Sequence, residues 1–212
     1  RLREDTLIIF TSDHGTQLMD HGFSNKHNWY DESWRVPLIV SQPGTLPEGE
    51  RRRFAIWNDL TTTILAAAGV SGSAVQHMQG YDLYTPLCQA KGSPRQYAAA
   101  TLYKTAAVAT QRWKLTYYFE DRRGQLFDRI ADPQEQVDLY DNAAYGKVRD
   151  QLLIGLLAWY GDTIDLHGLV ARSHRGGPIA QRAVAHIKGV SGLDAEERLN
   201  RICQEVDQTK GF

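Results

Sequence analysis

Two short apolar runs separated by a long polar stretch open the chain. Residues 5–12, DTLIIFTS, are typical of a strand buried on both faces of a parallel sheet. Residues 36–44, VPLIVSQPG, predict a second buried strand that Pro43-Gly44 ends. The intervening residues 13–34 predict a loop, with one helical turn near the sequence YDES.

A helix is predicted after the second strand. Asn58-Asp59 is a suitable N-cap for LTTTILAAAG, and Gly69 is a suitable C-terminal residue. The order strand, loop, strand, helix favours an α/β fold.

The pattern changes to short segments rich in Val, Thr, Tyr and Trp over residues 97–128. Together with a hairpin turn at 120–124, these segments predict a small antiparallel sheet. A turn-rich segment follows at 132–141. Residues 144–160 then carry an apolar stripe typical of a helix that packs on the sheet, and residues 194–206 predict an amphipathic helix.

Composition excludes little but directs the search to local chemistry. The 212 residues carry a net charge of −1, which favours neither nucleic acid nor a membrane surface as partner. No apolar run approaches the roughly 20 residues of a membrane span. Cys88 and Cys203 identify no compartment. Periplasmic, secreted and cytoplasmic locations all stay open, because we expect the true N-terminus to be missing. The chain lacks an initiating Met and enters a strand within six residues, so we interpret it as a piece of something longer.

Candidate chemistry gathers directly after the first strand. Open α/β sheets place their sites at strand carboxyl ends, where Asp13 and His14 are expected to lie. Gly15 allows a sharp turn there. His21, Lys26 and His27 follow on the same loop; singly, each residue is as well explained by an ordinary polar loop.

The stretch read as a whole resembles the metal-site segment of the sulfatases, within the alkaline-phosphatase-like superfamily. The matching motifs are Ser12-Asp13-His14-Gly15, His21-Gly22, Lys26, Tyr30-Asp31-Glu32-Ser33 and Arg35-Val36-Pro37-Leu38. Later segments, including Arg112-Trp113-Lys114-Leu115 and Asp132-Pro133-Gln134-Glu135, resemble the carboxyl-terminal subdomain of the same family.

The resemblance implies an alkaline-phosphatase-like central sheet followed by a small antiparallel sheet packed by a helix. We predict three parts: 1–92 as the end of the catalytic domain, 93–163 as the small subdomain, and 164–212 as a tail with a terminal helix. It also implies a sulfuric ester hydrolase with a divalent cation, usually calcium, on Asp13 and His14. Lys26 would contact the sulfate, with His21 and His27 as further catalytic candidates.

Two departures from the family pattern matter. The family's formylglycine nucleophile arises from a C/S-x-P-x-R motif, which this chain lacks, so the 212 residues alone are expected to be inactive. His14 supplies nitrogen where other members have an amide, and nitrogen suits manganese or zinc better than calcium.

Two other interpretations stay open. One is a metal-dependent phosphodiesterase or phosphonate monoester hydrolase of the same superfamily. The other is an inactive truncated homologue that acts as a structural or binding domain. The expected partner is a sulfated small molecule or saccharide, with neither nucleic acid nor membrane, and a homo-oligomer is left open.

Overall fold

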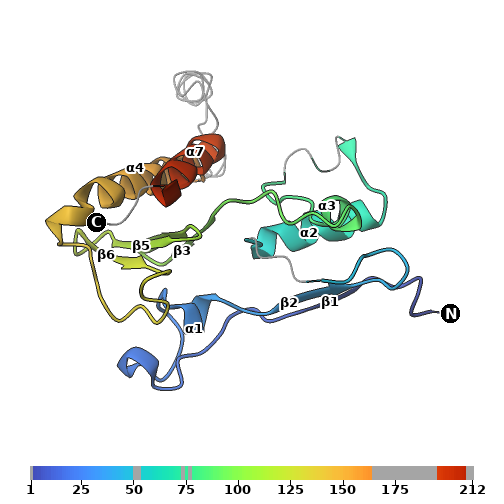
Figure 1. The fold of residues 1–212 in the computed structure, drawn as a ribbon, viewed down its shortest axis with the longest axis horizontal. Coiled ribbons are helices and arrows are strands. Elements are labelled where there is room, and N and C mark those ends of the chain that lie inside the picture. The colour runs from blue at the N-terminus through green and yellow to red at the C-terminus, as the bar shows by residue number, and fades with distance from the viewer. Residues whose placement is uncertain (1, 50–53, 73–74, 76–77, 164–194, 209–212) are drawn as a thin grey trace, which may run out of the picture. The chain divides into compact units, whose positions relative to one another are not determined.

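The computed structural model describes residues 2–49, 54–72, 75, 78–163 and 195–208 (Figure 1). The chain divides into two compact units, Arg1–Ala98 with Gln134–Gln136, and Ala99–Pro133 with Val137–Phe212. Within the described residues, no helix is both long and apolar enough to cross a membrane. Residues 164–194 and 209–212 of the predicted tail lie outside the described residues.

The first unit contains a two-stranded sheet. Strand β1 (Ile8–Thr11) pairs with β2 (Leu38–Ser41), and Phe10 lies opposite Ile39. The long connection between the strands holds the short 3-10 turn η1 (Asp20–Gly22) and the one-turn helix α1 (Asp31–Trp34), which confirms the helical turn expected near YDES.

The pairing of these strands corrects one expectation. β1 and β2 are antiparallel, and Ile8, Phe10 and Ile39 are exposed rather than buried in a parallel sheet. Side chains alternate between the two faces of a strand, so these three lie on one face and Ile9 and Val40 on the other. A continuous apolar run has no period that would distinguish these arrangements.

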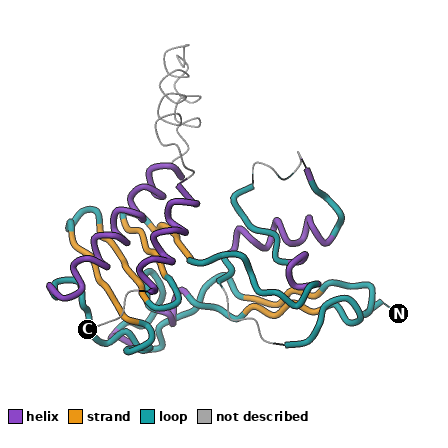
Figure 2. Tube along the Cα trace, turned by 45° about the horizontal axis from the view of Figure 1, so that its top comes forward, coloured by secondary structure: helices purple, strands orange, loops and turns teal. Residues whose placement is uncertain are grey.

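The first unit also contains helix α2 (Trp57–Ala67) and the short helix α3 (Tyr84–Cys88) (Figures 1 and 2). α2 starts before the predicted cap: Ile56 is the N-cap, and Asp59 lies in the first turn, where its Oδ2 accepts the Ile56 N–H at 2.9 Å. Gly69, with φ of 75°, follows the helix as predicted. Asp59 thus caps the helix by accepting a backbone hydrogen bond, although it lies in the first turn and not at the N-cap position.

The second unit contains the predicted antiparallel sheet. Its strands, in the order β3-β4-β5-β6, are β3 (Ala98–Leu102), β4 (Thr105–Ala109), β5 (Trp113–Tyr118) and β6 (Arg123–Asp128). β4–β5 and β5–β6 are antiparallel pairs. Val108, Trp113, Leu115 and Leu126 are fully buried and form the centre of its core.

Two long helices lie side by side over this sheet (Figure 1). After the 3-10 turn η3 (Ala143–Tyr145), α4 (Gly146–Thr163) buries Val148, Leu152 and Leu156, as its stripe predicts. α7 (Ala195–Gln208) confirms the predicted terminal helix and buries Leu199, Cys203 and Val206. Gly155 on α4 permits the approach, because a Cβ there would lie 2.8 Å from Leu199.

Candidate functional site

Asp13 and His14 leave the end of β1 and turn toward each other. The Asp13 carboxylate accepts the His14 backbone N–H at 3.0 Å, and its other oxygen lies 3.3 Å from His14 Nε2. The Asp13 side chain is 75% exposed. Desolvation raises the pKa of Asp13, but the hydrogen bonds that its carboxylate accepts, first of all from the His14 amide and also from the Asp13 amide and Ser12, help to outweigh it and hold the pKa below its ordinary value. Asp13 is therefore readily available as an anionic ligand.

The contacts of His14 orient its imidazole ring. Nδ1 lies 2.7 Å from the carbonyl oxygen of Gly15, which only accepts, so Nδ1 is assigned the proton. Nε2 then presents a lone pair, and Lys26 Nζ donates to it. The fold thus brings together Asp13, His14 and Lys26, the three residues that the sequence singled out first.

The pair fits a cation in chemistry and in spacing. Two ligands of one ion with bonds of about 2.0–2.6 Å lie roughly 3 Å apart, close to the 3.3 Å between His14 Nε2 and the Asp13 oxygen. A histidine that binds a metal usually donates its second ring N–H to a carbonyl or carboxylate, as His14 does to Gly15. In the part of the chain that the structure describes, no group of three His, Cys, Asp or Glu side chains gathers. Further ligands would have to come from elsewhere.

The short helix α1 packs against Gly15, the residue that follows His14. The Gly15 N–H donates to the carbonyl oxygen of Ser33 in α1 at 2.8 Å, and a Cβ on Gly15 would lie 1.9 Å from the Glu32 carbonyl oxygen. The approach therefore requires glycine.

Gln17 is a buried support that the sequence analysis missed. Its Nε2 donates to Asn28 Oδ1 at 3.1 Å and to Ser33 Oγ at 3.3 Å. Its backbone N–H donates to the Asn25 carbonyl oxygen, next to Lys26. These bonds tie the Lys26 segment to the strand end. A glutamine in a polar loop carries no sequence signal of burial.

His21 occupies a separate cluster. Its ring stacks on Tyr30, with centroids 3.7 Å apart and planes 7° apart, and its Nε2 lies 3.6 Å from Glu32 Oε2. His21 sits in the left-handed region at φ of 51°, between Met19 at 78° and Gly22 at 74°. This arrangement indicates that His21 fixes the conformation of the loop.

His27 lies on the exposed side of the loop. It follows Lys26 directly with φ of 80°, a left-handed conformation that is uncommon for a residue with a Cβ. Its backbone turns the chain between Lys26 and the buried Trp29.

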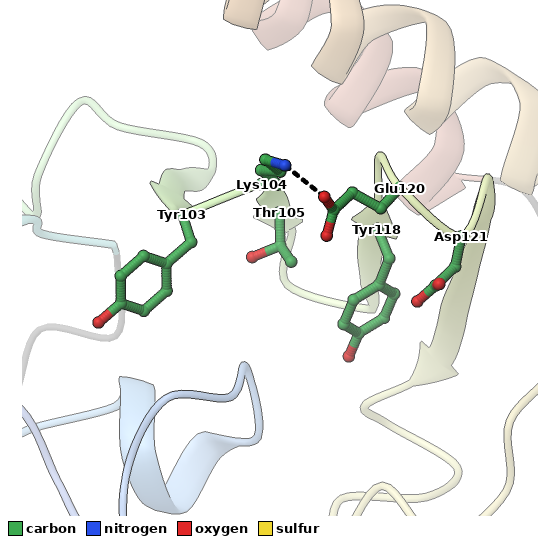
Figure 3. Close-up of a pocket in the computed structure, with 6 residues that line it drawn as sticks. All are labelled: Tyr103, Lys104, Thr105, Tyr118, Glu120 and Asp121. Atoms are coloured by element: carbon green, nitrogen blue, oxygen red, sulfur yellow. Dashed lines mark hydrogen bonds and ion pairs between the residues drawn. The ribbon is translucent and has the colours of Figure 1, made fainter.

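A pocket in the second unit contains none of the predicted site residues. It has a volume of 440 Å³ and is lined by Tyr103, Lys104, Thr105, Tyr118, Glu120 and Asp121. Figure 3 shows Lys104 paired with Glu120 at this pocket. With its lysine already neutralised by a carboxylate, the pocket offers little to an anionic substrate.

Comparison with known proteins identifies the family of the chain. The family described as N-sulphoglucosamine sulphohydrolase, C-terminal, matches residues 19–159. Among curated proteins, the multifunctional alkaline phosphatase superfamily protein PehA of Trinickia caryophylli is 54% identical over 209 residues, covering 81% of this chain and 39% of the relative. The choline-sulfatase of Rhizobium meliloti is 35% identical over 153 residues, covering 67% and 28%. The chain thus spans less than two fifths of the length of these relatives.

Solved structures give the same result. BT4656, solved in complex with its substrate D-glucosamine-2-N,6-O-disulfate, is 28% identical with a TM-score of 0.67, over 76% of this chain and 36% of that one. The phosphonate monoester hydrolase of Agrobacterium radiobacter is 27% identical with a TM-score of 0.62, over 73% and 35%. The chain therefore belongs to the sulfatase family of the alkaline-phosphatase-like superfamily, and it corresponds to the carboxyl-terminal portion of its members.

Proposed function

We propose that this chain is the metal- and anion-binding part of a hydrolase that cleaves sulfate esters. The observation that carries the proposal is the convergence of Asp13 Oδ2 and Lys26 Nζ on His14 Nε2. A carboxylate and an imidazole lone pair would bind a divalent cation, and the ammonium group would face the anionic ester beside it. The active protein would be longer, with a formylglycine nucleophile supplied by sequence that this chain does not contain.

The residues of this chain would act mainly by compensating charge. Asp13 and His14 would hold the cation, which when bound would polarise an oxygen of the ester. Lys26 would leave His14 Nε2 and place its charge against the sulfate oxygens, where negative charge grows in the transition state. The backbone N–H of Gly15, held by Ser33, would keep the strand end from shifting during this exchange.

Two arguments about the identity of the cation point in opposite directions. The family resemblance favours calcium, which prefers oxygen ligands. His14 offers nitrogen and Asp13 oxygen, a pair that suits manganese or zinc better. We keep calcium as the first candidate. Metal analysis after dialysis against each ion separately decides: preferential retention of calcium supports the first candidate, and preferential retention of manganese or zinc shows that the His14 ligand determines the choice.

Hydrolysis of phosphonate monoesters or phosphodiesters is the second candidate. Two observations favour it: the aspartate is followed by His14 rather than an amide, and a phosphonate monoester hydrolase is among the structural matches. Against it stand the family match and the relative that binds a sulfated saccharide. Both esters present a tetrahedral anion to the same cation and lysine, so the substrate must be identified by measurement.

The deciding experiment uses the full-length protein that contains this chain. Its kcat/KM is measured on an aryl sulfate, an aryl phosphonate monoester and an aryl phosphodiester. Lys26→Ala should lower kcat/KM for the preferred ester by about 10²–10³-fold, the usual effect of removing one charge-stabilising donor. Asp13→Asn and His14→Ala should lower the bound metal as well. Lys91→Ala, an exposed lysine in the same unit, is the matched control and should change neither.

Three results would contradict parts of the proposal. Preference for the phosphonate ester would select the second candidate. Turnover by the isolated 212 residues would refute their expected inactivity. Absence of bound metal, with Asp13→Ala tolerated, would indicate an inactive homologue that serves as a structural or binding domain.

A further inference from the structure

Glu135 contacts the first turn of α1 from a distant part of the sequence. Its Oε2 accepts the backbone N–H of Asp31 at 3.2 Å, across 104 residues of chain. Glu135 is 3% exposed, and its φ of 55° lies in the left-handed region. Residues on both sides of it in sequence, up to Pro133 and from Val137, belong to the second unit, whereas Gln134–Gln136 belong to the first. A strained backbone conformation persists only where the surrounding structure holds it, so the contact between buried Glu135 and α1 is part of the packed structure.

We propose that Glu135 is a positioning residue for the Asp13, His14 and Lys26 site, acting through α1. The role of this site in binding a metal and an anion rests on the proposed function, whereas the contacts from Glu135 to the site are observed. Asp31 is the first residue of α1, and two residues later the Ser33 carbonyl oxygen accepts the Gly15 N–H. Gly15 in turn accepts from the His14 ring, which orients Nε2.

The need for such a residue follows from the shortness of α1. A helix of four residues is a single turn, far below the length at which helices are stable alone. The first N–H groups of a helix require external acceptors, and the side chain of the N-cap residue Tyr30 does not cap α1. The Glu135 carboxylate supplies one from outside, in the manner of an N-cap side chain. Loss of this bond should loosen α1 and, with it, the Ser33–Gly15 contact.

The test can remove the bond from either side. Glu135→Ala removes the acceptor, whereas Glu135→Gln keeps an oxygen that can accept. Asp31→Pro removes the donor. Proline is tolerated at the first helical position, and Tyr30, with φ of −66° and ψ of 151°, already has the conformation that precedes a proline. Asp31→Ala retains the N–H and controls for loss of the side chain. Gln136→Ala, an exposed neighbour, is the surface control.

Two readouts are made on these variants. Hydrogen exchange of the Gly15 amide, followed by NMR in the 212-residue chain, should accelerate about threefold to tenfold in Glu135→Ala and Asp31→Pro, matching the loss of one hydrogen bond. Glu135→Gln, Asp31→Ala and Gln136→Ala should stay near the parent rate. In the full-length protein, manganese affinity should fall in Glu135→Ala and recover in Glu135→Gln.

The outcomes separate this inference from the proposed function. Unchanged Gly15 exchange in both Glu135→Ala and Asp31→Pro overturns the positioning role. Equal effects of Glu135→Gln and Glu135→Ala also overturn it, because the accepting oxygen would then not be what matters. If the two variants exchange the Gly15 amide faster but the parent protein binds no metal, the positioning role stays intact and the proposed function is refuted instead.

Discussion

Asp59 and Arg95 form a buried ion pair, 36 residues apart in sequence. Arg95 Nε and Nη2 donate to the two Asp59 oxygens at 2.9 and 2.7 Å, and neither side chain is more than 2% exposed. The same carboxylate accepts the Tyr81 N–H at 2.8 Å in addition to that of Ile56. One aspartate therefore joins the start of α2 to two later segments.

Breaking this pair should be costly. Arg95→Met leaves the Asp59 charge buried without its main counter-charge, and such losses typically destabilise by roughly 3–5 kcal/mol. Urea unfolding followed by circular dichroism measures the effect. The exposed pair of Lys104 and Glu120 is the control, because Lys104→Ala should hardly move the midpoint. A similarly small shift in Arg95→Met would mean that the site hydrates readily.

Gly15→Ala tests the close approach of the strand end to α1. The added Cβ would overlap the Glu32 carbonyl oxygen, so the backbone must separate and the Gly15–Ser33 bond must lengthen. We expect a lower melting temperature together with loss of metal binding. Gly146→Ala is the matched control: it lies at the start of α4 with no close neighbour, and alanine there should be neutral or stabilising by up to about 1 kcal/mol. Normal metal binding by Gly15→Ala would show that α1 does not support the site.

Asp128 predicts a pH dependence of stability. Burial raises its pKa, but the hydrogen bonds from Arg112, at 2.8 and 3.0 Å, and from the Ala131 and Ile130 amides outweigh burial and lower the pKa below the ordinary 3.8. Because the folded pKa is the lower one, the stabilisation is complete above the unfolded value and is lost as the pH falls through the folded value.

Asp128→Asn therefore provides a clear comparison with the parent. The variant should be less stable at pH 7, and the difference in unfolding free energy should shrink as the pH falls below about 4. Stability is measured by urea unfolding at several pH values. A difference that is independent of pH across this range would contradict the lowered pKa.

Local patterns in the sequence were sufficient for several elements. Leu152 and Leu156 lie four residues apart, as the 3.6-residue period requires for one face of a helix, and both are fully buried on α4. Short segments rich in Val, Thr, Tyr and Trp, together with a hairpin turn, likewise predicted the antiparallel sheet. For the α/β fold, the positions of β1 and β2 were predicted correctly, but their pairing depends on long-range contacts that a uniformly apolar run does not encode.

The candidate site shows a similar division. The proximity of Asp13 and His14 follows from their adjacency in sequence, and the family resemblance indicated Lys26. The role of Glu135 was not predictable, because it depends on the return of residues 134–136 to the first unit. Its segment was interpreted as a turn-rich crossing. The resemblance to the family motif at Asp132-Pro133-Gln134-Glu135 was the one available signal, and it specified no contact.

The face of β1 and β2 that carries Ile8, Phe10 and Ile39 has a practical consequence. These side chains form an apolar strip in contact with water, and among the described residues β1 and β2 pair only with each other. At the concentrations used for crystallisation or NMR, such strips favour self-association. Phe10→Lys, which places a charge on the strip without touching Asp13 or His14, is therefore the first substitution to make for a well-behaved sample.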